Sequence, residues 1–168
     1  MSRLVAAIAG LGLLASFVGH LGLVLGRDIV GAAWPVLFGG IFVVWFPTVL
    51  AMRRFGATMQ KKDGWKIALT GAPEWVRYVL YAAFIYAIVN FGLGFVGLYS
   101  LEGSGSWRMG SSHAMAFYAA AWGFAVAANR RDELGIDWKC QHGHDMTPGA
   151  KFCEECGAPA RVGWQADA

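Results

Sequence analysis

Charged residues are scarce in this chain. Of its 168 residues, 15% are Asp, Glu, Lys or Arg, whereas 57% are hydrophobic. Soluble domains carry about 25% charged residues, so this shortage excludes an ordinary water-soluble domain and indicates a membrane protein. Long uncharged stretches then predict helices, because only helices and closed barrels satisfy their own backbone hydrogen bonds in lipid.

Cysteine is scarce as well, and it is confined to one place. The three cysteines all lie between positions 140 and 156. An odd number at this close spacing excludes a closed disulfide framework and fits metal ligation better. Metal-binding thiolates also imply that this end of the chain faces a reducing compartment.

Two further absences narrow the function. The long uncharged runs hold none of the Asp, Glu, Lys or Arg residues on which proton relays and ion pathways depend, which argues against a pump or an ion-coupled transporter. The segment 138–168 carries three basic residues against four acidic ones, so it has no basic stripe and nucleic-acid binding is not expected. Nucleophilic triads, phosphate loops and paired catalytic carboxylates are not recognisable, and we expect a protein that is not an enzyme.

Four uncharged runs are long enough to cross a membrane, which takes about 20 apolar residues in a helix. They cover residues 4–26, 29–52, 78–101 and 109–129. The first exceeds the apolar core of a signal peptide, which is about 7–15 residues long, and it has no obvious cleavage site. Residues 1–131 therefore predict an all-α integral membrane protein, a bundle of four transmembrane helices.

The distribution of Lys and Arg predicts the orientation. The loop 53–77 carries six of these residues, whereas the other two loops carry one each, Arg27 and Arg108. Because basic loops stay in the cytoplasm, this loop and both termini are expected there. The expected location is the bacterial cytoplasmic (inner) membrane, with the lipid bilayer as the main partner.

A metal-binding motif follows the last run. Cys153 and Cys156 form C-x-x-C followed by Gly157, a spacing at which two thiolates converge on one tetrahedral Zn²⁺. Upstream, Cys140 is followed by His142, and Gly143 stands after this histidine as Gly157 stands after Cys156. His142 is thus the counterpart of a second cysteine.

Residues 140–158 resemble the short double-knuckle zinc ribbons at the ends of many bacterial proteins. The shared pattern is C-x-x-C-G-H, a short hairpin, and G-A-K-F-C-x-x-C-G, which this chain matches at 143–144, 149–153 and 156–157. It departs by placing His142 at the second ligand position and Lys139 where the first cysteine usually stands. The resemblance implies a small β-type ribbon at 139–160, after a linker at 132–138 and before a flexible tail at 161–168.

The predicted zinc ligands are Cys140, His142, Cys153 and Cys156. His144 is the alternative to His142, because C-x₃-H is also compatible with zinc. A closed set of four ligands is structural, since no position stays open for a catalytic water.

His20 and His113 are the remaining histidines. At 1.5 Å per residue, both lie at a similar depth near the same side of the predicted bundle. They would be able to hold haem b by axial ligation, or a metal. The alternative is a pair of histidines whose hydrogen bonds are satisfied by backbone or lipid headgroups.

These observations favour a non-enzymatic multi-pass membrane protein. Its cytoplasmic structural zinc ribbon would serve as a docking module, making the chain an accessory subunit of a membrane complex with a protein partner. One alternative is a haem-binding redox protein that uses His20 and His113. Another is a small channel, permease or lipid-binding protein.

Overall fold

The computed structural model describes residues 3–53, 64–100, 102–134, 136 and 138–161, which are mostly helical. The elements are α1 (Arg3–Val24), a 3₁₀ turn η1 (Gly31–Ala33), α2 (Trp34–Met52), α4 (Gly64–Ala68), α5 (Glu74–Phe95) and α6 (Ser104–Leu134). Positions 54–63 of the predicted basic loop, 135 and 137 of the predicted linker, and 162–168 of the predicted tail lie outside the described residues.

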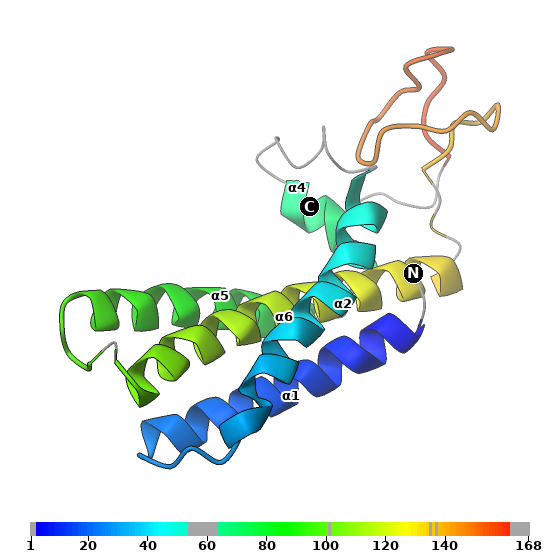
Figure 1. Ribbon diagram of the computed structural model, residues 1–168. Coiled ribbons are helices and arrows are strands. Elements are labelled where there is room, and N and C mark those ends of the chain that lie inside the picture. The colour runs from blue at the N-terminus through cyan, green and yellow to red at the C-terminus, as the bar shows by residue number, and fades with distance from the viewer. Residues whose placement is uncertain (1–2, 54–63, 101, 135, 137, 162–168) are drawn as a thin grey trace.

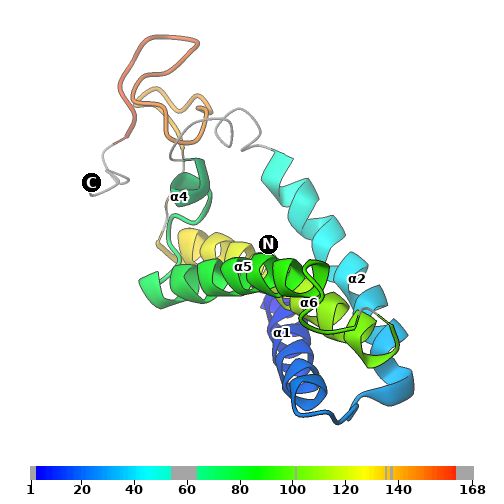
Figure 2. The ribbon, with the colours of Figure 1, turned by 90° about the vertical axis from the view of Figure 1, so that its left-hand side faces the viewer.

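The four long helices form an up-and-down bundle centred on α6. This helix contacts α1, α2 and α5, and α2 crosses the others obliquely (Figures 1 and 2). The side chain of Arg3 binds Glu133 at 3.1 Å, so α1 begins where α6 ends. The segment 138–161, which carries the predicted zinc ligands, packs against the same end, and we therefore call it the metal end of the bundle. Helix α4 also lies there (Figure 1).

The opposite end is closed by a tight connection between α1 and α2. Asp28 accepts hydrogen bonds from the backbone N–H of Gly31 at 2.8 Å and of Val30 at 3.2 Å, and from the indole N–H of Trp34 at 3.0 Å. The bond from Gly31 contributes most to lowering the pKa of this carboxyl group. Because Asp28 is charged at neutral pH, these bonds fix the turn that reverses the chain.

The prediction of four spans is corrected to three. Among the described residues, three helical segments are long and apolar enough to cross a membrane: Arg3–Val24, Gly31–Met52 and Glu74–Phe95. The run 109–129 lies inside α6 but does not reach the same apolarity, because it is rich in Ala, Gly and Ser. Its position explains this composition, since α6 is covered by the other helices and needs little surface that suits lipid.

Buried and exposed side chains also distinguish α6 from the other three long helices. Along α6, small residues such as Ala114, Ala119, Ala120 and Ala121 are fully buried, and their size lets neighbouring helices approach closely. The outer faces of α1, α2 and α5 expose large apolar side chains, among them Leu11, Phe42 and Ile88. Exposed apolar surface of this extent is typical of contact with lipid.

At the metal end, helix α6 continues to Leu134 and so includes residues 132–134 of the predicted linker. The predicted β-type ribbon is not confirmed. The described part of the predicted β-type ribbon contains no strands. Its pairing consists of three isolated antiparallel bridges: Lys139 with Asp145, Cys140 with Ala160, and Phe152 with Pro159. Turns and isolated bridges, instead of a continuous β-ladder, connect the described part of this segment.

We predict that Gly12→Ala destabilises the bundle. A Cβ at Gly12 would clash with the ring of Tyr118, which is 2% exposed and held by a 2.6 Å hydrogen bond from its hydroxyl to the carbonyl of Leu37. Overpacking of this kind costs about 1–3 kcal/mol. Thermal unfolding in detergent measures the effect. Gly92→Ala is the matched control, because its Cβ would meet no atom within 4 Å. Equal melting temperatures for the two variants would contradict this packing.

Candidate metal centre

Four potential ligands converge in the segment 138–161. They are Cys140, His144, Cys153 and Cys156, and their ligand atoms all lie within 4.8 Å of one another. The sulfurs of Cys140 and Cys156 are 3.7 Å apart, and the sulfur of Cys153 is 3.9 Å from Nδ1 of His144. These separations are typical of atoms at the corners of a tetrahedron around one metal ion, with ligand bonds of about 2.0–2.3 Å.

The first turn decides which histidine joins the group. The N–H of Gly143 donates to the carbonyl of Cys140 at 2.9 Å, so His142 occupies the tip of a tight turn and is exposed. After the turn, the backbone N–H of His144 donates to the sulfur of Cys140 at 3.3 Å. The structure thus groups His144, the alternative ligand, with the cysteines. His142, which the spacing favoured, lies outside the group.

The second turn presents the other two sulfurs. The N–H of Cys153 donates to the carbonyl of Ala158 at 2.8 Å, and the N–H of Gly157 donates to the carbonyl of Cys153 at 2.9 Å. These bonds fold C-x-x-C back on itself and bring Cys153 and Cys156 to the same site. The convergence that the spacing predicted for this pair is therefore present in the structure.

The candidate site has a buried half and an open half. Cys140 and Cys153 are 0% and 4% exposed, and both belong to one apolar cluster with Leu69, Val76 and Phe124 of the bundle. Cys156 is exposed, and the side chain of His144 is 41% exposed and lies 3.7 Å from a carboxylate oxygen of Glu155. The site is thus built into the end of the bundle on one side and faces solvent on the other.

The surroundings of Cys140 favour its thiolate form. Burial alone would raise the pKa of this thiol, but the backbone N–H groups of His144 and His142 point toward the sulfur, and the net effect lowers the pKa. The thiolate is the form that binds metal. Three thiolates and one imidazole form a closed set of ligands that suits zinc, which prefers tetrahedral N/S coordination.

Arg131 of α6, which the sequence marked only as part of the basic flank, bonds to the α4–α5 connection and packs against the start of the segment 138–161. Arg131 is 4% exposed, and its guanidinium donates to the carbonyls of Ala68 at 2.8 Å and Thr70 at 3.0 Å. The same group lies 5.2 Å from the ring centroid of Trp138. Gly149 adds a backbone contact, because with φ +85° it lies so near Ile67 that a Cβ would come within 2.5 Å.

His20 lies in a buried hydrogen-bond network far along the chain from the cysteines. The hydroxyl of Ser111 donates to the carbonyl of Arg108 at 3.0 Å, so its oxygen accepts from Nδ1 of His20 at 2.8 Å. Nε2 of His20 then accepts from the hydroxyl of Tyr86 at 2.6 Å. This arrangement assigns the Nδ1–H tautomer, and it joins α1, α5 and α6 at one level.

His113 contacts different groups. Its Nδ1 lies 2.9 Å from the carbonyl of Met109 in its own helix, and its ring meets Phe91 edge to face. For His20, haem ligation would require a ring nitrogen that is already engaged by Ser111 or Tyr86. His113 thus bonds to the backbone, whereas His20 bonds to side chains of two other helices instead of to backbone or lipid headgroups. Tyr86 and Ser111 were not singled out by their sequence context, because nothing local marks them as partners of His20.

We predict that His20→Ala destabilises the bundle by about 1–2 kcal/mol, because Tyr86 loses its acceptor and a cavity remains. Thermal unfolding in detergent is the measurement. His113→Ala is the control, since it removes a bond within one helix, and the expected loss is smaller. A control variant that lost as much stability as His20→Ala would count against a special role for the network.

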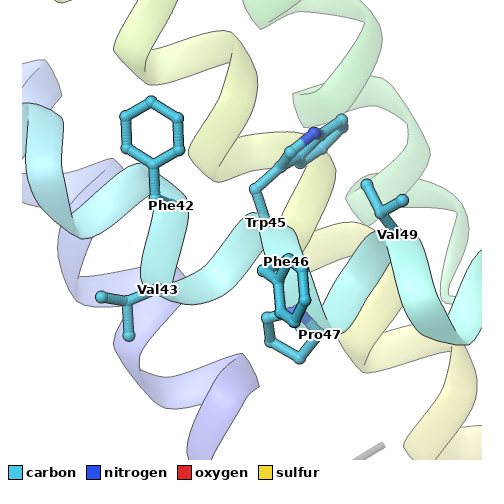
Figure 3. Close-up of a pocket in the computed structure, with 6 residues that line it drawn as sticks. All are labelled: Phe42, Val43, Trp45, Phe46, Pro47 and Val49. Carbon is cyan, nitrogen blue, oxygen red and sulfur yellow. The ribbon is translucent and has the colours of Figure 1, made fainter.

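An apolar depression runs along the outside of α2. Its lining side chains all come from this one helix, as Figure 3 shows: Phe42, Val43, Trp45, Phe46, Pro47 and Val49. The indole N–H of Trp45 is the one polar group among these side chains. The chemistry of the surface suits lipid chains and offers nothing for a polar substrate.

Comparison of the chain with protein-family models, curated proteins and solved structures gives no match. The resemblance of residues 140–158 to zinc ribbons therefore rests on the motif itself. What the structure adds is the Cys₃His group and three helical segments suited to a membrane.

Proposed function

We propose that this protein is a non-enzymatic membrane subunit whose helix bundle carries a structural zinc site at one end. The observation that carries the proposal is the Cys₃His group, two of whose cysteines lie in the same apolar core as α4, α5 and α6. A closed set of four protein ligands has no position for a catalytic water, which favours a structural role over hydrolysis. Zinc bound there would stabilise a segment that is too short for a core of its own.

We place the metal end in the cytoplasm of a bacterium and the bundle in its inner membrane. Support comes from the basic residues of this end, among them Arg3, Arg53, Lys66 and Arg130, against Arg27 and Arg108 toward the opposite end. Thiolate ligands also persist best in a reducing compartment. Three apolar spans with exposed Leu, Ile and Phe side chains suit insertion into a bilayer. The central helix α6, which contacts all three, would return the chain through the bundle to the metal end.

A docking role is supported by the outward side of the metal-binding segment. Phe152 is 63% exposed beside the second turn, close to the exposed carboxylates of Glu154 and Glu155. The inner side of the segment is buried against the bundle, so this outer side would stay in a fixed orientation. A rigid patch of this kind would suit a protein partner within a membrane complex.

Elemental analysis and visible absorption of the full-length protein in detergent test the proposal. We expect one zinc ion per chain and a colourless preparation. Chelation should then expose Lys139 and Lys151 to trypsin while the bundle keeps its helicity. Absence of zinc, or unchanged trypsin sensitivity after zinc removal, would contradict the proposal. Iron with a haem spectrum would favour the redox alternative through His20 and His113.

A further inference from the structure

The open half of the candidate metal site contains a thiol that small oxidants can reach. Cys156 is exposed, whereas Cys140 and Cys153 are buried. A metal-bound cysteine is a thiolate, which is the form that reacts with peroxides, and susceptibility follows thiolate character and exposure. Cys156 is therefore the ligand whose sulfur would react first with hydrogen peroxide.

A second thiol lies next to it. The sulfur of Cys140 is 3.7 Å from that of Cys156, although the two residues are 16 positions apart in the chain. The sulfur of Cys153 lies 3.9 Å from Nδ1 of His144 and within 4.8 Å of both other sulfurs, so the pairing has to be tested. The two turns of the segment thus place the Cys140 sulfur 3.7 Å from that of Cys156, where it can react with an oxidised Cys156.

From this geometry we propose that Cys156 and Cys140 form a peroxide-sensitive disulfide that releases the metal. The inference rests on the proposed zinc site. The sulfur of Cys156 attacks one peroxide oxygen, the O–O bond breaks, and hydroxide leaves, which gives a sulfenic acid. The Cys140 thiolate then attacks the Cys156 sulfur, the S–S bond forms, the S–O bond breaks, and a second hydroxide leaves.

The step is balanced without another reactant. Two thiolates lose two electrons in total, one hydrogen peroxide gains them, and two protons from solvent convert the two hydroxides into water. His144 and Cys153 then remain as two ligands, which are too few for a structural zinc site. Because the disulfide joins the two turns that held the metal, the halves of the segment stay together, and reduction can restore the site.

Trypsin distinguishes a disulfide that involves Cys140 from one between Cys153 and Cys156. It cuts after Lys139, Lys151 and Arg161, so Cys140 leaves on the peptide 140–151, while Cys153 and Cys156 leave on 152–161. The zinc-loaded full-length protein is treated with hydrogen peroxide, released zinc is measured with a colorimetric chelator, and free thiols are alkylated before digestion. We expect one zinc released per chain and the two peptides linked. Dithiothreitol with added zinc should reverse both changes.

Two variants identify the paired residues. Cys153→Ser should keep the link between the peptides, and Cys156→Ser should lose it. Retained zinc with free thiols, or a disulfide confined to the peptide 152–161, would overturn the inference while leaving the zinc site intact. A preparation without zinc before peroxide is added would instead overturn the proposed function, and this inference with it.

Discussion

His144→Ala is expected to weaken zinc binding roughly a hundredfold, whereas His142→Ala leaves the affinity unchanged. The imidazole of His144 lies within 4.8 Å of the three cysteine sulfurs, and that of His142 does not join the group. Structural zinc contributes about 10–16 kcal/mol in small Cys/His domains, so one ligand of four represents about 3 kcal/mol, or roughly a hundredfold in affinity. Competition with a chromophoric chelator measures this difference.

The two substitutions form a matched pair. Both remove an imidazole from the same short turn region, two positions apart, so a general effect on solubility or expression would appear in both. Trypsin sensitivity at Lys139 and Lys151 should rise in His144→Ala and stay low in His142→Ala. Zinc loss in His142→Ala together with retention in His144→Ala would reverse the ligand assignment and restore the one that the sequence spacing favoured.

Arg131→Ala is expected to release the α4–α5 connection from α6 and to loosen the packing of Trp138 at the start of the metal-binding segment. The guanidinium donates to the carbonyls of Ala68 and Thr70 and lies over Trp138. Hydrogen bonds to a charged group contribute about 1.5–3 kcal/mol each, so removal of both should cost about 3 kcal/mol or more. Hydrogen exchange should show the loss in the segments 64–72 and 138–146, with little change in α1.

Arg130→Ala is the control for this prediction. Its side chain is half exposed, and its ion pair with Glu133 is long, at 3.9 Å. Exposed ion pairs of this type contribute about 0–1 kcal/mol, so little change is expected. If the two neighbouring substitutions reduced protection in 64–72 equally, the effect would reflect lost positive charge at this end of the chain, and the role assigned to Arg131 would be wrong.

The predictions made from sequence differ in a consistent way from the structure. Cys153 and Cys156 were predicted together correctly, because C-x-x-C is a local motif whose turn almost dictates convergence. The choice between His142 and His144 depended on where the first turn points its side chains. The sequence suggested His142, because it stands where a second cysteine usually stands. In the structure, however, the hydrogen bond from the N–H of Gly143 to the carbonyl of Cys140 places His142 at the tip of the turn.

The bundle shows the same contrast. Apolar runs predicted α1, α2 and α5, because lipid selects directly for an apolar surface. The run 109–129 was also predicted as an apolar span, yet it is less apolar than the other three, because α6 is the central helix and its surface meets other helices. Small residues on a central helix allow close packing of its neighbours, a property that hydropathy does not measure.

The sequence by itself determined that the chain carries apolar helices suited to a membrane, and it placed the cysteines of a metal site near the C-terminus. Both follow from local composition and spacing. Tertiary structure alone decided that α6 is central, that His144 joins the group of potential ligands, and that Arg131 ties α6 to the α4–α5 connection beside Trp138. These depend on contacts between residues far apart in the chain, such as Arg131 with Ala68, and on the directions in which turns project their side chains.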